Sequence, residues 1–283
     1  MKMENSTDIL EVNAPTENNA NEKIHSWRIC PVGQHYVRTH PENIHPSKIH
    51  PDGEAISRQG HCANNPTHKN SEGKERSTKD ILSFPELQII AETHFHDLQG
   101  PPKANILEFK NEAKFDSLIR GWVYYWNAVF KAKDPLDPNL VKALIAGESS
   151  FIPDKTNSTG SKKLGIARGL MQLTDDTLKK INGHEIELKD NFIHLTTDEA
   201  MDPAENICAG TRWLFMKYAG ARERFTKEGK GHIATWDDAV AEYKGLLKGM
   251  IDHKNDPKNY PNEPDPYNAM PTFRAFYKQL LEG

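Results

Sequence analysis

Glu148 is the residue whose type and position best fit acid–base chemistry. It lies four residues after Leu144 and three after Ile145, so on a helix it projects from or beside their apolar stripe. Burial there and the negative end of the helix dipole both disfavour the charged form of a carboxyl group. The position therefore predicts a carboxyl group that stays protonated nearer to neutral pH, as a general acid must. The competing interpretation is a solvent-facing glutamate just past the stripe.

A second set of candidate residues has metal-ligand chemistry. Cys30, His35, His40, His61 and Cys62 offer sulfur and nitrogen ligands for a tetrahedral zinc ion. Metal binding can supply the folding energy that a small Pro-rich module without its own core lacks. We expect Cys30, His35, His40 and Cys62 as ligands of a structural zinc, although their spacing matches no familiar zinc finger. The alternatives are a disordered histidine-rich leader and a strand-like module with scattered surface imidazoles.

Helices are expected to position Glu148. Apolar residues over 115–130 follow helical spacing. Asp137-Pro138 is typical of a helix start, with an aspartate cap and a proline in the first turn. Asp202-Pro203-Ala204-Glu205 repeats that signal, with Glu205 completing a capping box. Further helices begin at Thr235, with Trp236, Val240, Tyr243 and Leu247 expected on one face, and at Pro271. No comparable run of alternating apolar residues is present, so the C-terminal part is predicted to be all-α or nearly so.

Composition divides the chain into unequal regions. Nine of the thirteen histidines precede residue 97, and long apolar-periodic stretches come only after residue 110. We expect a disordered leader over 1–24 and a His/Cys/Pro-rich small module or extended segment over 25–80. A linker with a short helix follows over 81–110. Residues 111–283 form the helical domain, so the fold class is mainly α with a low-regularity N-terminal region.

Charge and hydropathy exclude several function classes. A formal net charge of -4 gives no basic footprint for nucleic acid. No run approaches the length of a membrane span, and the N-terminus lacks the apolar core of a secretory signal. Mean hydropathy is -0.73, which predicts loop-rich or disordered parts in a soluble chain. Three cysteines are too few for a disulfide framework, so we expect synthesis in a reducing cytoplasm, with Cys208 in the core.

Four short motifs resemble one enzyme family. They occur in the family's order over residues 134–250, under half of the chain. The motifs are Gly147-Glu148-Ser149-Ser150-Phe151 with Pro153, then Gly169-Leu170-Met171-Gln172, then Pro203 with Asn206-Ile207 and Gly210, and Ala241-Glu242-Tyr243. Together they resemble the soluble lytic transglycosylases and goose-type lysozymes of glycoside hydrolase family 23, which implies a lysozyme-like helical domain.

The resemblance implies roles for individual residues. Glu148 matches the general acid and base, and Ser149 the residue that helps to hold the glutamate and substrate. Gly169, Leu170, Met171 and Gln172 match a segment that lines the sugar groove and binds substrate. Glycine allows close backbone approach there, and Gln172 can form a hydrogen bond to substrate. Tyr243 matches a tyrosine that faces the catalytic carboxyl. Leu170, Met171 and Tyr243 also fit a plain core role.

The implied substrate is the glycan strand of bacterial peptidoglycan. In a lytic transglycosylase, one glutamate protonates the bond between N-acetylmuramic acid and N-acetylglucosamine and then deprotonates the muramic C6 hydroxyl. A muramidase would need a second carboxylate. Asp154, Asp175 and Asp176 are candidates, but the last two fit the first turn of a helix capped by Thr174, where acidic residues are stabilising. We therefore favour the transglycosylase, which needs no cofactor for catalysis.

Two departures from the family keep other functions open. Extra residues lie between Phe151 and Gly169, and Lys244 replaces the asparagine of the usual Ala-Tyr-Asn-Ala-Gly. These features favour a catalytically weak peptidoglycan-binding or assembly protein as the rival. A third interpretation is a metal-binding adaptor.

The expected substrate and the expected place of synthesis lie on different sides of a membrane. Delivery by a secretion apparatus or by a phage would carry the protein to the periplasm or cell wall after non-classical export. An antibacterial effector would also have an immunity or inhibitor protein as partner.

Overall fold

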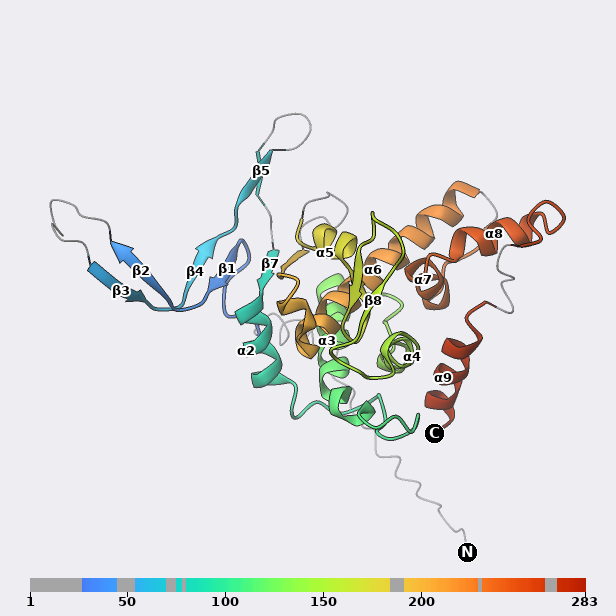
Figure 1. The fold of residues 1–283 in the computed structure, drawn as a ribbon, viewed down its shortest axis with the longest axis horizontal. Coiled ribbons are helices and arrows are strands. Elements are labelled where there is room, and N and C mark those ends of the chain that lie inside the picture. Colours follow the sequence, from blue (N-terminus) through green and yellow to red (C-terminus); the bar gives the residue numbers. More distant parts are fainter. Residues whose placement is uncertain are drawn as a thin grey trace, which may run out of the picture.

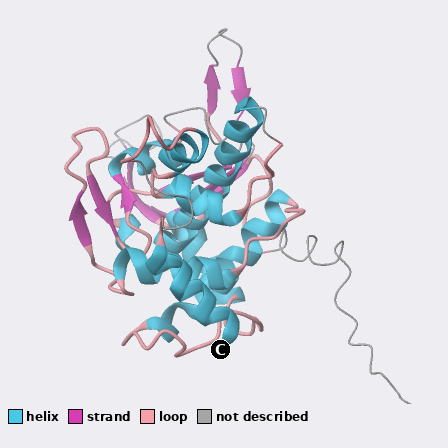
Figure 2. Ribbon diagram, turned by 90° about the vertical axis from the view of Figure 1, so that its right-hand side faces the viewer, coloured by secondary structure: helices cyan, strands magenta, loops and turns pink. Residues whose placement is uncertain are grey.

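The computed structural model describes residues 27–44, 54–69, 75–77, 80–183, 191–228, 231–262 and 269–283. Helices form the body of the molecule, and β-hairpins project from one side of it (Figure 1). A view at right angles shows the same helical body with strands at its margins (Figure 2). The predicted mainly α fold class is confirmed. The leader expected over 1–24 lies outside the described residues.

Three helices form the centre of the body: α3 (Asp116–Phe130), α4 (Pro138–Ser149) and α6 (Pro203–Glu228). Trp122 and Val123 are fully buried, which confirms the predicted inner face of α3. The Trp126 indole donates a hydrogen bond to the Cys208 carbonyl at 3.1 Å and so joins α3 to α6. Cys208 is buried, as expected. None of the described helices is long and apolar enough to cross a membrane.

Two of the predicted helix starts are confirmed in detail. The Asp137 carboxylate accepts a hydrogen bond from the main-chain nitrogen of Asn139 at 2.8 Å and caps α4. Thr235 and Asp238 form a complete capping box at the start of α7 (Trp236–Tyr243). Each signal is local, because a cap and its donors lie within one turn.

The start of α6 differs from the prediction in one respect. Asp202 accepts a hydrogen bond from the main-chain nitrogen of Ala204 at 2.9 Å. Glu205, however, is fully buried and neither of its carboxyl oxygens has a hydrogen-bond partner. The expected capping box is therefore wrong, because the Asp202 main-chain N–H donates to the Glu199 carbonyl at 3.1 Å and not to the Glu205 carboxyl group.

The C-terminal helices include a break that the spacing does not predict. Leu247 was expected to continue the face of the helix that starts at Thr235. Gly245 instead adopts a left-handed φ of +72°, which ends that helix and starts α8 (Leu247–Asn255). The last helix, α9 (Pro271–Glu282), begins at the predicted proline and packs against α4. The break leaves Tyr243 and Lys244 at the end of α7.

A small antiparallel sheet lies beside the helices, in the order β10-β9-β8. Its strands are β8 (Thr156–Ser158), β9 (Ile166–Arg168) and β10 (Leu173–Thr174). Arg168 pairs with Thr156 on one side and with Leu173 on the other. Strands of two or three residues carry no readable alternation, so the sequence did not predict them. The extra residues that follow Phe151 thus form a hairpin.

Other strands precede the helical domain. Antiparallel pairs join β1 (Gln34–Val37) to β4 (His61–Asn64), β2 (His40–Ile44) to β3 (Glu54–Arg58), and β5 (Thr67–Lys69) to β6 (Glu75–Ser77). The β2–β3 and β5–β6 pairs extend away from the helical body (Figure 1). Described parts of the 25–80 region are therefore a strand-rich module.

The segment after that module belongs to the core and is not a linker. β7 (Asp80–Ser83) pairs in parallel with β11 (Asn191–His194), which precedes α6. Directly after β7, α2 (Phe84–His94) buries Leu87 and Ile90 completely. The Phe95 ring meets the Trp122 ring edge-on, with centroids 4.9 Å apart. The short helix expected here is confirmed, but its apolar face packs on α3.

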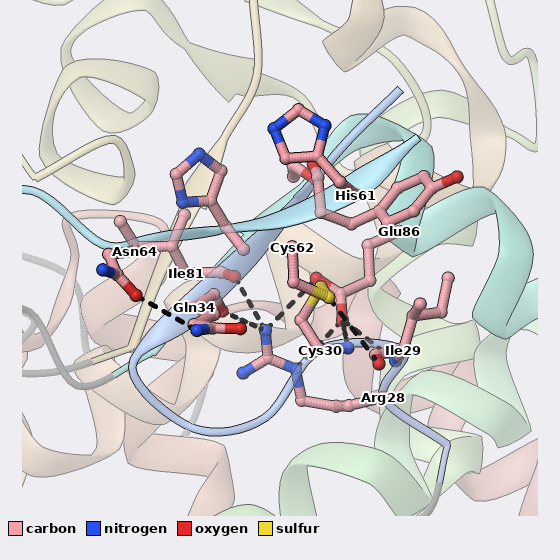
Figure 3. Close-up of a disulfide and its surroundings, with 12 residues drawn as sticks. Arg28, Ile29, Cys30, Gln34, His61, Cys62, Asn64, Ile81 and Glu86 are labelled. Carbon is pink, nitrogen blue, oxygen red and sulfur yellow. Dashed lines mark hydrogen bonds and ion pairs between the residues drawn. A yellow bond between two sulfur atoms is a disulfide. The ribbon is translucent and has the colours of Figure 1, made fainter. Parts of the chain in front are cut away.

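Cys30 and Cys62 form a disulfide and not a zinc site (Figure 3). Both sulfur atoms are bonded to each other, so neither is a thiolate ligand, and the predicted metal site is wrong. His35 contacts the Asn65 side chain at 3.0 Å. The His40 side chain lies outside the described part. Within that part, no group of three or more His, Cys, Asp or Glu residues could hold a metal ion.

A buried ion pair fixes the disulfide segment to α2 (Figure 3). Glu86 is fully buried and accepts hydrogen bonds from Nε and Nη2 of Arg28, both at 3.2 Å. Its carboxylate also accepts the main-chain N–H of Ile29 at 3.3 Å. These polar contacts hold the disulfide segment of the module to the helical domain.

Another buried ion pair fixes α4, the helix that carries Glu148. Lys142 is fully buried and contacts Asp116 at 2.8 Å and Glu112, in the 3-10 helix η1 (Glu112–Phe115), at 3.4 Å. Its ammonium also donates to the Lys103 carbonyl at 2.7 Å. These contacts hold α4 in place from the side opposite to solvent.

Candidate active site

Glu148 occupies the last turn of α4. The chain leaves the helix through two consecutive left-handed residues, Ser150 with φ +54° and Phe151 with φ +59°. Phe151 is fully buried, and its ring lies 5.5 Å from that of Phe109 and 6.4 Å from that of Phe115, centroid to centroid. This anchor turns the chain sharply, so α4 ends with the Glu148 side chain at the surface.

The surroundings of the Glu148 carboxylate differ from the apolar setting that the sequence predicts. Its side chain is 19% exposed and forms an ion pair with the Lys244 ammonium, which is 22% exposed. Lys155 lies close by, and its ammonium donates to the Glu148 main-chain carbonyl at 3.0 Å. The Lys155 ammonium thus binds a main-chain carbonyl at the C-terminal end of α4, and the Lys244 ammonium contacts the Glu148 carboxylate.

Tyr243 lies beside Glu148, as the resemblance implies. Its hydroxyl donates a hydrogen bond to the Met171 carbonyl at 2.6 Å. Burial, followed by the negative charge of Glu148, raises the pKa of Tyr243 well above its ordinary value. The phenol is therefore neutral and a hydrogen-bond donor at neutral pH.

Asn206, a residue of the third motif, holds the Gly169–Gln172 segment by hydrogen bonds. The Asn206 amide oxygen accepts the Met171 main-chain N–H at 2.7 Å. Its amide nitrogen donates to the carbonyls of Arg168 at 3.1 Å and Ala200 at 2.7 Å. Gly169 has φ +73°, and a Cβ there would lie 2.2 Å from that nitrogen. Glycine is needed for this close approach, as predicted, and the approaching group is Asn206.

The side-chain amide of Gln172 forms its hydrogen bonds within the protein. Its amide oxygen accepts a hydrogen bond from Asn157 at 2.6 Å. Its amide nitrogen donates to the carbonyls of Lys155 at 3.1 Å and Gly169 at 2.8 Å. Both amide hydrogens are therefore engaged. The predicted direct hydrogen bond from Gln172 to substrate does not fit this arrangement. The Gln172 amide instead joins Asn157 of β8 to the Gly169 carbonyl.

Three other predicted substrate contacts are buried. Ser149, Leu170 and Met171 have no exposed surface. The Ser149 hydroxyl donates to the Ile145 carbonyl at 3.1 Å, within its own helix. The side chains of these residues support the site from behind, so the direct contacts predicted for them are wrong.

Two of the three candidate second carboxylates stabilise local structure. Asp176 pairs with Lys180 at 3.0 Å within α5 (Asp175–Ile181). Asp175 accepts the Ile166 main-chain N–H at 2.9 Å and pairs with Arg168. The Ile166 hydrogen bond is the main cause that lowers the pKa of Asp175. Asp154, in contrast, is exposed just beyond the turn after α4.

The arrangement offers a partly exposed carboxyl group, that of Glu148, with the Lys244 ammonium in contact with it and Tyr243 near it. Such a carboxyl group can give a proton to a leaving oxygen and accept a proton afterwards. Asn206 and Gln172 hold the main chain of the Gly169–Gln172 segment in place, and the carbonyl of Met171 in that segment accepts the Tyr243 hydroxyl. Glycosidic bond cleavage with a single acid–base residue fits this geometry.

Comparison with protein families gives a match within the helical domain. Residues 126–245 match the model described as the transglycosylase SLT domain. The match includes Glu148, the Gly169–Gln172 segment, Asn206, Tyr243 and Lys244. Searches of curated proteins and of solved structures give no match to the chain.

Proposed function

We propose that this protein is a lytic transglycosylase that cleaves peptidoglycan, because residues 126–245 match the transglycosylase SLT domain model. We place its catalysis on Glu148 alone and its cleavage at the β-1,4 bond between N-acetylmuramic acid and N-acetylglucosamine. The observation that carries the proposal is the partly exposed Glu148 carboxylate at the end of α4, near enough to Tyr243 for its charge to raise the pKa of that phenol.

The reaction uses one carboxyl group twice. Protonated Glu148 gives its proton to the glycosidic oxygen, and the bond from that oxygen to muramic C1 breaks. The glutamate, now ionised, takes the proton of the muramic C6 hydroxyl as that oxygen bonds to C1. The products are a strand with a free N-acetylglucosamine 4-hydroxyl and a 1,6-anhydromuramic end, with no water consumed.

A muramidase is the alternative on the same domain. Hydrolysis would need a second carboxylate to position water or to attack the sugar. Since Asp175 and Asp176 hold other groups, Asp154 is the remaining candidate among the three. It lies on the chain that leaves α4 and is exposed.

Release of soluble fragments from purified sacculi tests the proposal. Glu148→Gln should lower the rate by at least about 100-fold, the usual size of a general-acid contribution. Glu242→Gln is the matched control, because Glu242 pairs with Arg224 at 3.2 Å, on α6. Asp154→Asn should also retain activity. Loss of activity in Asp154→Asn would favour the muramidase, and full activity in Glu148→Gln would contradict the proposal.

A catalytically weak binding protein predicts a different result. Wild-type protein would then bind sacculi in a sedimentation assay and release nothing. The Lys244 contact with Glu148 is the observation that favours this second candidate, since an ion-paired carboxylate has no proton to give.

We also propose that the protein acts in the cell wall or periplasm, as an antibacterial effector or a phage-associated lysin. The Cys30–Cys62 disulfide supports this place of action, because such bonds persist in oxidising compartments and are rare in the cytosol. Delivery would use a secretion apparatus or a phage, and an effector would need an immunity protein that covers the groove at Glu148. Thiol labelling should find Cys30 and Cys62 oxidised in delivered protein and reduced in cytoplasmic protein.

A further inference from the structure

We propose that Lys244 binds a carboxylate of the muramic acid unit and thereby releases Glu148 for catalysis. This inference rests on the proposed function and adds a specificity-determining residue to it. In the free protein Lys244 contacts the Glu148 carboxylate. In the complex it exchanges that carboxylate for one on the substrate.

The reaction sets a requirement on the charge of Glu148. Glu148 must carry a proton when it meets the glycosidic oxygen. A protonated carboxyl group attracts an ammonium group far less than a carboxylate does. Lys244 therefore loses its ionic partner at the moment when the site becomes reactive, and a partly enclosed cation without a counter-charge is unfavourable.

The other polar groups near Glu148 already form hydrogen bonds within the protein. The Lys155 ammonium donates to the Glu148 carbonyl at 3.0 Å, and the Tyr243 hydroxyl donates to the Met171 carbonyl at 2.6 Å. The Gln172 amide holds two further carbonyls. Lys244 differs from these groups, because its described partner is the catalytic carboxylate itself. It is the group at this site that must change partner during the reaction.

The substrate carries a carboxylate that can replace Glu148 as the partner of Lys244. Muramic acid carries a lactyl arm on C3, in the same ring as the C1 atom at which the bond breaks. That arm ends in a free carboxylate where stem peptides have been removed, and it leads to peptide carboxylates where they remain. Lys244 is partly exposed at the end of α7, and its long flexible side chain can turn from Glu148 to such a group. The shared ligand chemistry is a carboxylate on the lactyl arm.

Three glycan preparations test this proposal. The first has free lactyl carboxylates after amidase treatment, the second is the same material with its carboxylates converted to methyl amides, and the third retains stem peptides. Lys244→Met should lower kcat/KM about tenfold or more on a carboxylate-bearing preparation, the usual size for loss of a charged hydrogen bond, mainly through KM. It should leave the amidated strands cleaved as fast as by wild type or faster. Lys244→Arg should keep the preference for carboxylates.

The pattern of losses identifies the source of the carboxylate. A loss on amidase-treated strands assigns the lactyl carboxylate, and a loss confined to stem-bearing strands assigns the peptide. An equal change on carboxylated and amidated strands would overturn the proposal, because Lys244 would then act on Glu148 alone.

Binding measurements separate this proposal from the proposed function. In Glu148→Gln the neutral amide cannot form the ion pair, so Lys244 is available to the ligand. The Kd of Glu148→Gln for carboxylate-bearing strands should be about tenfold lower than that of Glu148→Gln/Lys244→Met, with no difference on amidated strands. If wild type cleaves no strand, the proposed function fails, whereas equal binding by the two variants would overturn the role of Lys244.

Discussion

Glu205 makes the free energy of unfolding of the domain fall as the pH rises above the ordinary pKa of a glutamate. Its side chain is fully buried at the start of α6, next to Asp202. Burial, followed by the proximity of Asp202, raises the pKa of Glu205 from its ordinary 4.5 to about 9. The folded protein therefore holds a proton on Glu205 at neutral pH, while the unfolded chain does not. Glu205→Gln replaces that protonated carboxyl group with a neutral group of the same shape.

The magnitude follows from proton linkage. Below the unfolded pKa both states are protonated, and Glu205 has no effect on the pH dependence. Between the two pKa values the folded state binds one more proton, so the free energy of unfolding falls by about 1.4 kcal/mol for each pH unit. From about pH 5 to about pH 8 this amounts to at most about 4 kcal/mol. Glu205→Gln should abolish this decrease.

Urea denaturation at these two pH values measures the effect. Glu205→Gln should be more stable than wild type by several kcal/mol at the higher pH and nearly equal to it at the lower pH. Glu223→Gln is the matched control on the same helix, because Glu223 is exposed and pairs with Lys227 at 2.6 Å. Its small effect should not grow with pH in this direction. A loss of stability in Glu205→Gln that is the same at both pH values would refute a protonated Glu205.

Two further predictions concern the groove segment and the N-terminal module. Gly169→Ala should lower the free energy of unfolding by about 1 to 3 kcal/mol in urea denaturation and lower sacculus cleavage, because its Cβ would displace the Asn206 amide at a left-handed position; unchanged stability would contradict that contact. Reduction of the Cys30–Cys62 bond, which spans 32 residues, should lower the stability by about 3 to 4 kcal/mol. Thermal denaturation with and without reductant measures this, and the double Cys→Ser variant should not respond to reductant.

The parts of the fold that the sequence predicted depend on local interactions. Asp137 caps its helix two residues away, and Thr235 does so three residues away. The apolar face of α3 repeats within one helical turn, so its buried residues were also identifiable. Glu148 was found at a helix end for the same reason.

The interactions that the sequence did not predict join distant residues. Lys244 and Glu148 are 96 residues apart, Asn206 and Met171 are 35 apart, and the two bonded cysteines are 32 apart. No periodicity links such pairs, because only the packing of whole helices brings them together. The metal prediction failed on this point, since residue types suitable for zinc are also suitable for a disulfide.

Burial also explains the errors at the site. The family motif identifies positions around the site. It does not distinguish exposed side chains, which could contact substrate, from buried side chains that support them. Ser149 and Met171 face inward, and the Gln172 amide is used by main-chain carbonyls. Their contribution is to the packing and hydrogen bonding of the main chain around the site.

Cleavage of sacculi in water enriched in ¹⁸O tests the central claim most directly. If Glu148 closes the 1,6-anhydro ring with the muramic C6 hydroxyl, the new muramic ends should carry no ¹⁸O and should be one water lighter than reducing ends in mass spectra. Glu148→Gln should give neither product. Reducing muramic ends that contain one ¹⁸O atom would contradict the transglycosylase mechanism and show that water attacks the sugar.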